Sequence, residues 1–405
     1  MYLGNQQRME KHKLLFLVDK MQNGGAERQM LKIAALYSNE YEIHVSSLFQ
    51  ADPTMLEQTK KLGFIYKELQ HKPHKSKLQV FFQLYKSYKE LKKIISCNNY
   101  HAVFSFLEWS NVLSIKAVSS ANKKSEIKNF INVRNYLSNQ YGSKSKVKLF
   151  FASKILARFY NQAERVFCNS NAIKQDLVSN FSVPEPLVEV IYNSLNIEKL
   201  IEQAKVSVDL ELTNKDNLTF VTCGRLVEQK QVVSLLLSFD EYNRKTNRND
   251  QLVIIGDGEH KVLLTDYIKK NNINAQLIGH QSNVATWFKN ADCFLLNSYF
   301  EGFPNVLAEA VALGTYSIVA DCLSGPREIM TNFELLDYTT QLPDIYKTPL
   351  GILYKVQNNP YVINMHLVHA LEQGVEAIKV HSRDKVQTKL LDENFGVKQW
   401  LRVFD

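Results

Sequence analysis

The chain of 405 residues has 45% hydrophobic and 22% charged residues, which suits a folded globular protein of two domains, and it holds no apolar run of about 18 residues for a membrane-spanning helix. Its polar amino terminus differs from a signal peptide and its five scattered cysteines lack metal or redox spacing, so we expect a cytoplasmic protein with reduced thiols and no metal or other cofactor. The formal net charge of +8 is unevenly distributed, because residues 1–187 carry 28 Lys and Arg against 14 Asp and Glu, whereas the remainder carries 21 against 27.

The basic first half predicts an anionic partner for that half of the chain. Nucleic acid is one candidate, but the sequence carries no recognition motif for it, so no nucleic-acid partner is expected. An anionic membrane surface is favoured, because basic and aromatic residues are interleaved in His71–Lys93 and Ser143–Tyr160, two predicted helices with one apolar stripe each. The alternative for each stretch is an ordinary surface helix whose apolar side packs into the core.

Strands and helices alternate through the first half, which predicts a parallel sheet covered by helices. The first strand is expected at Leu14–Asp19, followed by a turn with Gly24 and Gly25 and a helix at Ala26–Tyr37. These glycines let the backbone approach a ligand closely, but the turn lacks the G-x-G-x-x-G spacing of a dinucleotide site. Further strands are expected at Tyr41–Leu48, His101–Leu107 and Ile127–Val133, with Arg165–Ser170 closing the first sheet.

Ser182–Asn196, which contains two prolines, is the predicted hinge to a second alternating half. Strands of that half are expected at Asn217–Leu226, Gln251–Gly258, Ala275–His280, Cys293–Ser298 and Thr315–Asp321. The last residues, from about Val386 to Asp405, are expected to form an aromatic-bearing helix. We therefore place the domains at 1–187 and 188–385, with the terminal helix at 386–405.

Residues 301–328, EGFPNVLAEAVALGTYSIVADCLSGPRE, carry the most informative pattern of the chain. Glu301 and Glu309 stand eight residues apart around a Gly-Phe-Pro-Asn loop, between a predicted buried strand and a predicted helix at Val306–Leu313. Ligands of α/β sheets bind at such strand-to-helix junctions. Because carboxylates are acceptors, these two suit the hydroxyls of a sugar and of a ribose.

The loop between the two carboxylates also suits an anion. Pro304 is compatible with the first turn of the helix, where a missing N–H is no loss. Free N–H groups of Phe303, Asn305 and Val306 would face the anion, helped by the helix dipole. The stretch therefore predicts a nucleotide-sugar site.

The spacing of Glu301 and Glu309 resembles the E-x(7)-E signature of retaining glycosyltransferases of family 4, and Ser324–Ile329 (SGPREI) resembles the members that build bacterial surface polysaccharides. The resemblance covers nearly the whole chain, most strongly residues 217–330. It implies the α/β GT-B fold, with two Rossmann-like parallel-sheet domains facing a cleft and a C-terminal helix crossing back to the first domain. The first domain would take the acceptor and the second the donor. By resemblance, Glu301 contacts the donor sugar and Glu309 holds the ribose.

Arg225 and Lys230 lie just beyond a predicted strand end, in GRLVEQK, where two cations can neutralise a diphosphate without a metal. The resemblance gives them this role, and with Glu301 they are the predicted catalytic residues. The predicted donor-binding residues are Glu309, Gly24, Gly25, Phe303, Pro304, Asn305, Gly256, Gly258 and His280. Of these, Gly256 and Gly258 form a tight turn after a strand, and His280 lies where similar enzymes hold the base.

On the acceptor side, Arg134 and Asn135 follow a predicted strand end. Many members of the family carry a His after the fourth strand, but the corresponding run here is SFLEWSNVL, without a His. Glu108 is our interpretation of the residue that takes its place.

These features predict a metal-independent, retaining glycosyltransferase that moves a sugar from a nucleotide-diphosphate donor, UDP being favoured, to a hydroxyl of a lipid-linked or growing surface glycan. It would lie peripherally on the inner face of the cell membrane. The alternative is a non-catalytic GT-B partner or a glycan-binding protein of a transferase complex. Such proteins often lose the acids and cations of the donor site, whereas this chain keeps all four. The sequence leaves the sugar, the acceptor and the linkage open.

Overall fold

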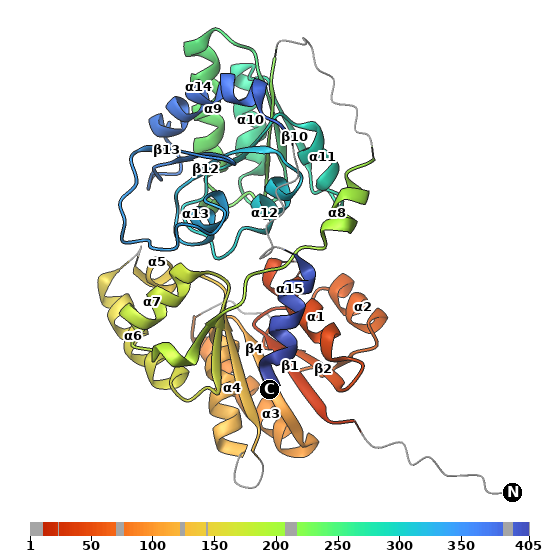
Figure 1. Ribbon diagram of the computed structural model, residues 1–405. Coiled ribbons are helices and arrows are strands. Elements are labelled where there is room, and N and C mark those ends of the chain that lie inside the picture. Colours follow the sequence, from red (N-terminus) through yellow and green to blue (C-terminus); the bar gives the residue numbers. More distant parts are fainter. Residues whose placement is uncertain are drawn as a thin grey trace, which may run out of the picture. The chain divides into compact units, whose positions relative to one another are not determined.

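A computed structural model describes residues 11–22, 24–69, 77–121, 126–142, 145–206, 217–383 and 392–404. The chain divides into two compact units (Figure 1). Unit 1 comprises Met1–Cys168, Lys174–Ile191 and Val397–Asp405, and unit 2 comprises Asn169–Ile173 and Tyr192–Gly396. Three parts of the predicted segments, His71–Ser76, Ser143–Lys144 and Val386–Leu391, lie outside the described residues.

Unit 1 is built on a parallel sheet with the strand order β3-β2-β1-β4-β5-β6-β7 among the described residues. Its strands are β1 (Lys13–Val18), β2 (Glu42–Ser47), β3 (Ile65–Tyr66), β4 (Tyr100–Phe106), β5 (Lys128–Val133), β6 (Arg165–Cys168) and β7 (Val188–Val190). The helices of this half are α1 (Gly25–Tyr37), α2 (Pro53–Lys61), α3 (Lys77–Asn98), α4 (Glu108–Ala121), α5 (Leu137–Gly142), α6 (Lys146–Tyr160) and α7 (Asn171–Phe181), with the short 3₁₀ helix η1 (Glu185–Leu187).

Helices cover both faces of this sheet, because successive side chains of each strand point to opposite faces. Phe16 of β1 belongs to a hydrophobic cluster with Leu31 of α1 and Trp400, whereas the adjacent Leu17 belongs to a second cluster with Leu91 of α3. Trp400 lies in α15 (Glu393–Leu401), which runs beside α1 in Figure 1 and is followed by η3 (Arg402–Phe404). The carboxyl-terminal residues therefore complete the core on the α1 face.

Unit 2 has the strand order β10-β9-β8-β11-β12-β14-β13, parallel except for the antiparallel pair β13–β14. Its strands are β8 (Thr219–Cys223), β9 (Gln251–Ile255), β10 (Ala275–Gly279), β11 (Cys293–Leu296), β12 (Tyr316–Ala320), β13 (Ile345–Thr348) and β14 (Gly351–Tyr354). Its helices are α8 (Ile197–Gln203), η2 (Glu228–Lys230), α9 (Val232–Thr246), α10 (Lys261–Asn271), α11 (Ala285–Asn290), α12 (Asn305–Ala312), α13 (Gly325–Met330) and α14 (Met365–Val380). The strand order reverses between β8 and β11, which marks the place where such sheets bind ligands.

The predicted pair of Rossmann-like parallel sheets is confirmed, with three differences. The short edge strand β3 was not predicted. Arg165–Ser170 does not close the first sheet, because β7 pairs in parallel with β6. That strand lies inside the predicted hinge, where Pro184 and Pro186 suggested an irregular segment. The β13–β14 hairpin was not predicted, because it follows the last strand–helix repeat. No helix in the described ranges is long and apolar enough to cross a membrane.

Candidate functional site

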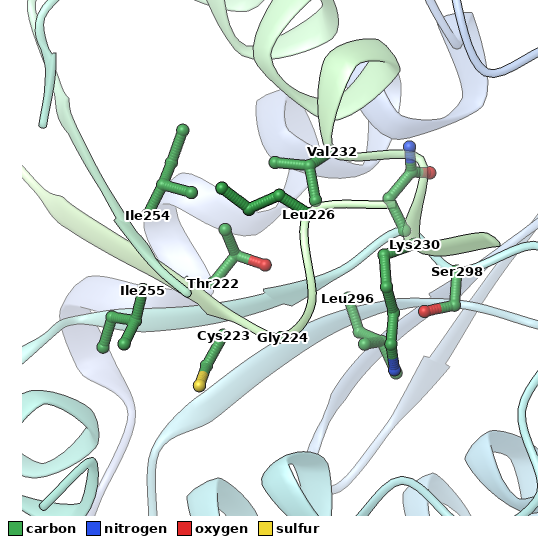
Figure 2. Close-up of a pocket in the computed structure, with 11 residues that line it drawn as sticks. Thr222, Cys223, Gly224, Leu226, Lys230, Val232, Ile254, Ile255, Leu296 and Ser298 are labelled. Carbon is green, nitrogen blue, oxygen red and sulfur yellow. The ribbon is translucent and has the colours of Figure 1, made fainter. Parts of the chain in front are cut away.

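A pocket lies in unit 2 where the carboxyl ends of β8 and β11 diverge (Figure 2). It is lined by the ends of β8, β9 and β11, by the loop that follows β8, and by Lys230. The lining residues are Thr222, Cys223, Gly224, Leu226, Lys230, Val232, Ile254, Ile255, Leu296, Asn297 and Ser298. The predicted strand-end position of Lys230 thus coincides with the topological switch point of the sheet.

Lys230 and Glu301, predicted separately, are in direct contact. The Nζ atom of Lys230 donates to Oε1 of Glu301 at 2.5 Å, and both side chains are largely buried. The hydroxyl of Ser298 donates to the same oxygen at 2.5 Å. In Figure 2 the side chain of Lys230 extends past Ser298 toward Leu296. Two donors, both from residues that line the pocket, therefore fix one carboxylate oxygen of Glu301.

Arg225 differs from Lys230 in its surroundings. It lies in the loop after β8 and is exposed. Over the described part of the chain, no ion pair or side-chain hydrogen bond engages its guanidinium. Its charge is therefore available to an anionic ligand, whereas the ammonium group of Lys230 is already paired with a carboxylate.

Gly256 and Gly258 shape the loop beside this site by a close backbone approach. Both have positive φ, and a Cβ atom on Gly256 would lie 1.9 Å from the carbonyl oxygen of Gly224. A Cβ atom on Gly258 would lie 2.6 Å from the carbonyl oxygen of Leu226. The Leu226 N–H donates to the carbonyl of Asp257 at 2.9 Å, which joins the two loops. These glycines are thus needed for packing, and their contact with a donor stays a prediction.

The loop after Glu301 is held largely by its own side chains. Pro304 occupies the N-cap position and α12 begins at Asn305, so Pro304 precedes the first turn in which it was expected. The ring of buried Phe303 packs against Tyr192 at 5.8 Å between centroids. The Oδ1 atom of Asn305 accepts from Nδ2 of Asn193 at 2.7 Å. The side chains of Phe303 and Asn305 therefore fix the loop, which leaves their backbone N–H groups as the predicted anion contacts.

The loop that follows β12 braces the Glu301 backbone, which sequence reasoning missed. The N–H of Glu301 donates to the carbonyl of Leu323 at 2.7 Å, and the N–H of Ser324 returns a bond to the carbonyl of Glu301 at 3.0 Å. The Ser324 hydroxyl donates to the Gly302 carbonyl at 2.9 Å. A Cβ atom on Gly325 would lie 2.7 Å from that same carbonyl oxygen. The Ser-Gly pair of SGPREI could have indicated this close contact between the two loops. In the sequence it was interpreted only as a marker of the family.

Glu328 of the same motif is also structural. It is fully buried, and its carboxylate accepts from the N–H groups of Asn171 and Ala172 at 3.0 and 3.1 Å, at the start of α7. The Tyr192 hydroxyl donates to it at 2.5 Å. Burial raises the pKa of Glu328 in spite of these donors. A carboxylate at a helix amino terminus complements the helix dipole and satisfies free N–H groups.

The remaining predicted donor residues lie on separate elements. Glu309 is partly buried on α12, and His280 is exposed after β10. Gly24 is the N-cap of α1 in unit 1, where a Cβ atom would lie 2.4 Å from Oε2 of Glu27, and Gly25 is the first residue of that helix. The described residues contain no group of three His, Cys, Asp or Glu side chains that could hold a metal ion.

In unit 1 the structure brings together Glu108 and Asn135, whose acceptor-side role stays a prediction. Nδ2 of Asn135 donates to Glu108 at 3.5 Å, and Nε2 of Gln140 donates to it at 3.2 Å. Burial raises the pKa of Glu108. Arg134 is also buried, and desolvation lowers its pKa to about 10. The ends of the neighbouring strands β4 and β5 thus supply a largely buried polar cluster around Glu108.

Asp19, at the end of β1, belongs to this cluster and was missed. Its Oδ1 atom accepts from the N–H and the hydroxyl of Ser110, both at 2.7 Å, in the first turn of α4. Burial, and then the nearby charge of Glu108, raise the pKa of Asp19 to about 7. An Asp directly after an apolar first strand was the signal that could have identified it.

Known proteins match both halves of the chain. The family model described as Glycosyltransferase Family 4 matches residues 23–199, and that described as Glycosyl transferases group 1 matches residues 207–341. A glycosyltransferase of Methanocaldococcus jannaschii is 30% identical over 287 residues, which cover 69% of this chain and 70% of that protein. A Campylobacter jejuni N-acetylgalactosaminyltransferase, named for a diphospho-undecaprenol-linked substrate, is 26% identical over 80% of this chain and 84% of its own length.

Solved structures agree with the family matches. Anabaena HepE in complex with UDP-glucose has a TM-score of 0.73 at 17% identity, and covers 97% of this chain and 99% of its own. The lipopolysaccharide outer core galactosyltransferase WaaB has a TM-score of 0.66 at 20% identity, with 96% and 98% covered. The fold match, the two family models and the relative at 30% identity agree, and the chain belongs to the GT-B glycosyltransferases of family 4.

Proposed function

We propose that this glycosyltransferase transfers a sugar from a nucleotide-diphosphate donor, with UDP as the nucleotide, and retains the anomeric configuration. The observation that carries the proposal is the contact of Lys230 with Glu301 beside the exposed cation Arg225, at the switch point of unit 2. The likeness to HepE, whose structure holds UDP-glucose, supports a donor of this class.

In the proposed donor complex, Arg225 and Lys230 bind the diphosphate and Glu309 accepts from the ribose hydroxyls. A diphosphate that binds Lys230 competes with Glu301 for the ammonium group, because Lys230 and Glu301 form an ion pair. Ser298 keeps its bond to Oε1 of Glu301 and so holds the carboxylate for the donor sugar. Phe303–Asn305, Gly256, Gly258, His280 and the Gly24–Gly25 turn remain the further proposed donor contacts.

The proposed reaction is a front-side attack. The acceptor hydroxyl oxygen bonds to the anomeric carbon on the face from which the diphosphate leaves, and the acceptor proton passes to an oxygen of the leaving diphosphate. Negative charge develops on that group as the bond breaks. Arg225, Lys230 and the amino-terminal N–H groups of α12 would stabilise the charge, which is the main source of catalysis in such a site. We propose that no divalent metal is required.

The proposed acceptor is a lipid-linked or growing glycan of a surface polysaccharide. The Campylobacter relative, named for an undecaprenol-linked substrate, supports this class of acceptor, as does the relative named for amylovoran biosynthesis. Glu108, Arg134 and Asn135 are the proposed acceptor-side residues. We also propose peripheral association with the anionic inner face of the membrane, because the first half carries a large excess of basic residues.

A panel of UDP-sugars tests the proposal. One sugar nucleotide should raise the thermal stability of the protein and be consumed with release of UDP when a lipid-linked glycan is added, with and without EDTA. Nuclear magnetic resonance of the product should show the anomeric configuration of the donor. An inverted product would exclude retention, and activity that EDTA abolishes and Mg²⁺ restores would exclude metal independence. If the protein binds UDP-sugars but never cleaves them to free UDP, it is the non-catalytic GT-B partner.

A further inference from the structure

The apolar stripe of α6 faces away from the core of unit 1. Its members Val147, Phe150, Phe151 and Ile155 follow the three- and four-residue spacing of one helix face, and each is 53% to 64% exposed. The opposite face of α6 carries the buried Leu156 and Tyr160, which pack inside unit 1. The core alternative considered for the sequence is therefore wrong for this helix, because its aromatic side is exposed.

Helix α3 repeats this arrangement. Phe81, Phe82 and Tyr85 are 51% to 70% exposed, whereas Leu84 and Leu91 are buried on the other side against the sheet. Isolated exposed apolar side chains are ordinary on protein surfaces, but clusters of large aromatic ones indicate an interaction surface. Both helices that carried the predicted membrane signal thus expose a cluster of large aromatic residues on one face.

The two exposed stripes belong to one layer of helices. Both α3 and α6 pack against α4, which lies on the sheet face opposite α1. Packed helix axes are about 8–10 Å apart, so two helices that flank a third are separated by about 20 Å. We call the outward faces of α3 and α6, with Phe81, Phe82, Tyr85, Phe150, Phe151 and Ile155, the insertion surface.

The charges around the insertion surface select an anionic occupant. Helix α6 carries Lys146, Lys148, Lys154 and Arg158 and no acid. Two of the cations lie over exposed rings, Lys154 over Phe150 at 5.9 Å and Lys89 over Tyr85 at 4.7 Å from the centroid. Such long side chains can keep their apolar stems on a ring and their ammonium groups in a polar layer. A second copy of the chain would bring two basic faces together, which like-charge repulsion opposes.

We propose that the insertion surface enters the interface of an anionic lipid leaflet, with the aromatic side chains among the acyl chains and the Lys and Arg side chains at the headgroups. This deepens the proposed membrane association, on which it rests, by naming the residues and the mode of contact. Binding would then have two parts, an electrostatic one that salt weakens and an apolar one that salt does not. A purely electrostatic surface would lose nearly all binding at high salt.

Co-sedimentation with phosphatidylglycerol vesicles and with phosphatidylcholine vesicles, at low and high salt, tests this surface. The test variants are the pairs F150S/F151S and F81S/F82S and the charge variant K146Q/K148Q/K154Q. The matched control is V262S/L263S, an adjacent exposed apolar pair on α10 in unit 2. Calorimetry with UDP accompanies each variant, so that an effect on the membrane is separated from an effect on the donor site.

The parent should bind phosphatidylglycerol vesicles more tightly than phosphatidylcholine vesicles and keep part of that binding at high salt. Each aromatic pair should weaken the binding about tenfold or more at either salt concentration, since each buried ring contributes substantially to transfer from water. The charge variant should lose mainly the salt-sensitive part of the binding, and the control should behave as the parent.

Unchanged binding by both aromatic variants, or complete release of the parent by salt, would overturn the proposal. The proposal would also be overturned if the parent bound no vesicles but self-associated, and if the aromatic substitutions abolished that self-association. If the parent itself does not bind UDP, that result counts against the proposed donor and not against the insertion surface.

Discussion

The pairing of Lys230 with Glu301 is the residue-scale feature with the clearest consequence for function. A mostly buried ion pair is costly to break from one side, because the remaining charge is left unpaired. In a donor complex the diphosphate can take over Lys230, while Glu301 is still held by Ser298. The ion pair therefore holds both groups in place and neutralises their charges at the proposed diphosphate site.

Substitution Glu301→Ala tests this exchange. It removes the competitor for Lys230, so we expect UDP affinity to stay equal or to rise, by up to about 1 kcal/mol. Sugar transfer should fall strongly, because the proposed contact with the donor sugar is lost. Calorimetry with UDP and an assay of transfer give the two quantities. A large loss of UDP affinity would show that Glu301 contributes to nucleotide binding and would contradict the assigned role.

Glu309 on α12, eight residues further along the chain, should behave in the opposite way. If its carboxylate accepts from the ribose hydroxyls, Glu309→Ala should weaken UDP binding by about 1.5–3 kcal/mol, the range for hydrogen bonds to a charged group. Binding of free diphosphate should not change, because it has no ribose. Calorimetry with UDP and with pyrophosphate separates the two, and equal losses for both ligands would exclude the ribose contact.

Asp19→Asn tests the buried cluster of unit 1 through its pH dependence. The pKa of Asp19 is raised from 3.8 to about 7 in the folded protein, so the folded state binds a proton that the unfolded state releases. Stability from this group is therefore full below about pH 4 and is lost as the pH rises through about 7, by at most about 4 kcal/mol. An Asn keeps an acceptor for Ser110 and carries no charge.

We expect Asp19→Asn to be more stable than the parent above pH 7, with a difference that shrinks toward pH 4. Hydrogen exchange of α4 amides reports this unit separately from unit 2. A difference that does not vary with pH would show that Asp19 ionises normally.

At the scale of elements, the sequence indicated the strand ends to within a few residues, because parallel strands are short apolar runs followed by polar or glycine residues. Glu301, Lys230 and Arg225 all follow such runs, so their gathering at one sheet edge could be predicted from order and spacing. The contacts that hold these residues in place could not be predicted from the sequence. Glu328 contacts Asn171 across 157 residues, and the Ser324 brace on Gly302 depends on how two loops meet in space. The pattern of neighbouring residues in the sequence contains no information on either of these long-range contacts.

The brace between the loops after β11 and β12 can be tested at Gly325. A Cβ atom there would lie 2.7 Å from the Gly302 carbonyl oxygen and 3.0 Å from Cα of Phe303, both backbone atoms of the Glu301 loop. Gly325→Ala must therefore displace that loop, at a typical cost of about 1–3 kcal/mol for overpacking. We expect weaker UDP binding and slower transfer, measured by calorimetry and by UDP release.

Gly374→Ala is the matched control in the same unit. Its new Cβ atom would meet the end of the Ile318 side chain, which can move, and it lies in the interior of α14. This variant should bind UDP as the parent does. If Gly325→Ala also binds UDP normally, the loop after β12 does not position the donor site.

At the scale of the whole molecule, the two sheets share the order of their first five strands, which turns at the first strand of each sheet, yet only the first half of the chain is strongly basic. That asymmetry agrees with donor binding proposed for one unit and membrane contact proposed for the other. Unit 1 is also discontinuous, because Val397–Asp405 return to it after the chain has formed unit 2. Its core is therefore completed by a segment that follows unit 2 in the sequence.

Trp400→Ala measures how much these last residues contribute. The indole is buried, with its ring 4.9 Å from that of Phe167, and the Tyr37 hydroxyl donates to the Trp400 carbonyl. Replacing a buried Trp by Ala typically costs about 3–5 kcal/mol, so unit 1 should unfold at clearly lower denaturant concentration.

Trp109→Ala is the control, because Trp109 is half exposed on α4 of the same unit and its replacement should cost little stability. Calorimetry should show unchanged UDP affinity in both variants, since Arg225, Lys230 and Glu309, the proposed contacts for the diphosphate and the ribose, lie in unit 2. Equal stability of the two variants would mean that unit 1 folds independently of its carboxyl-terminal segment, and loss of UDP binding in Trp400→Ala alone would mean that the donor site depends on that segment as well.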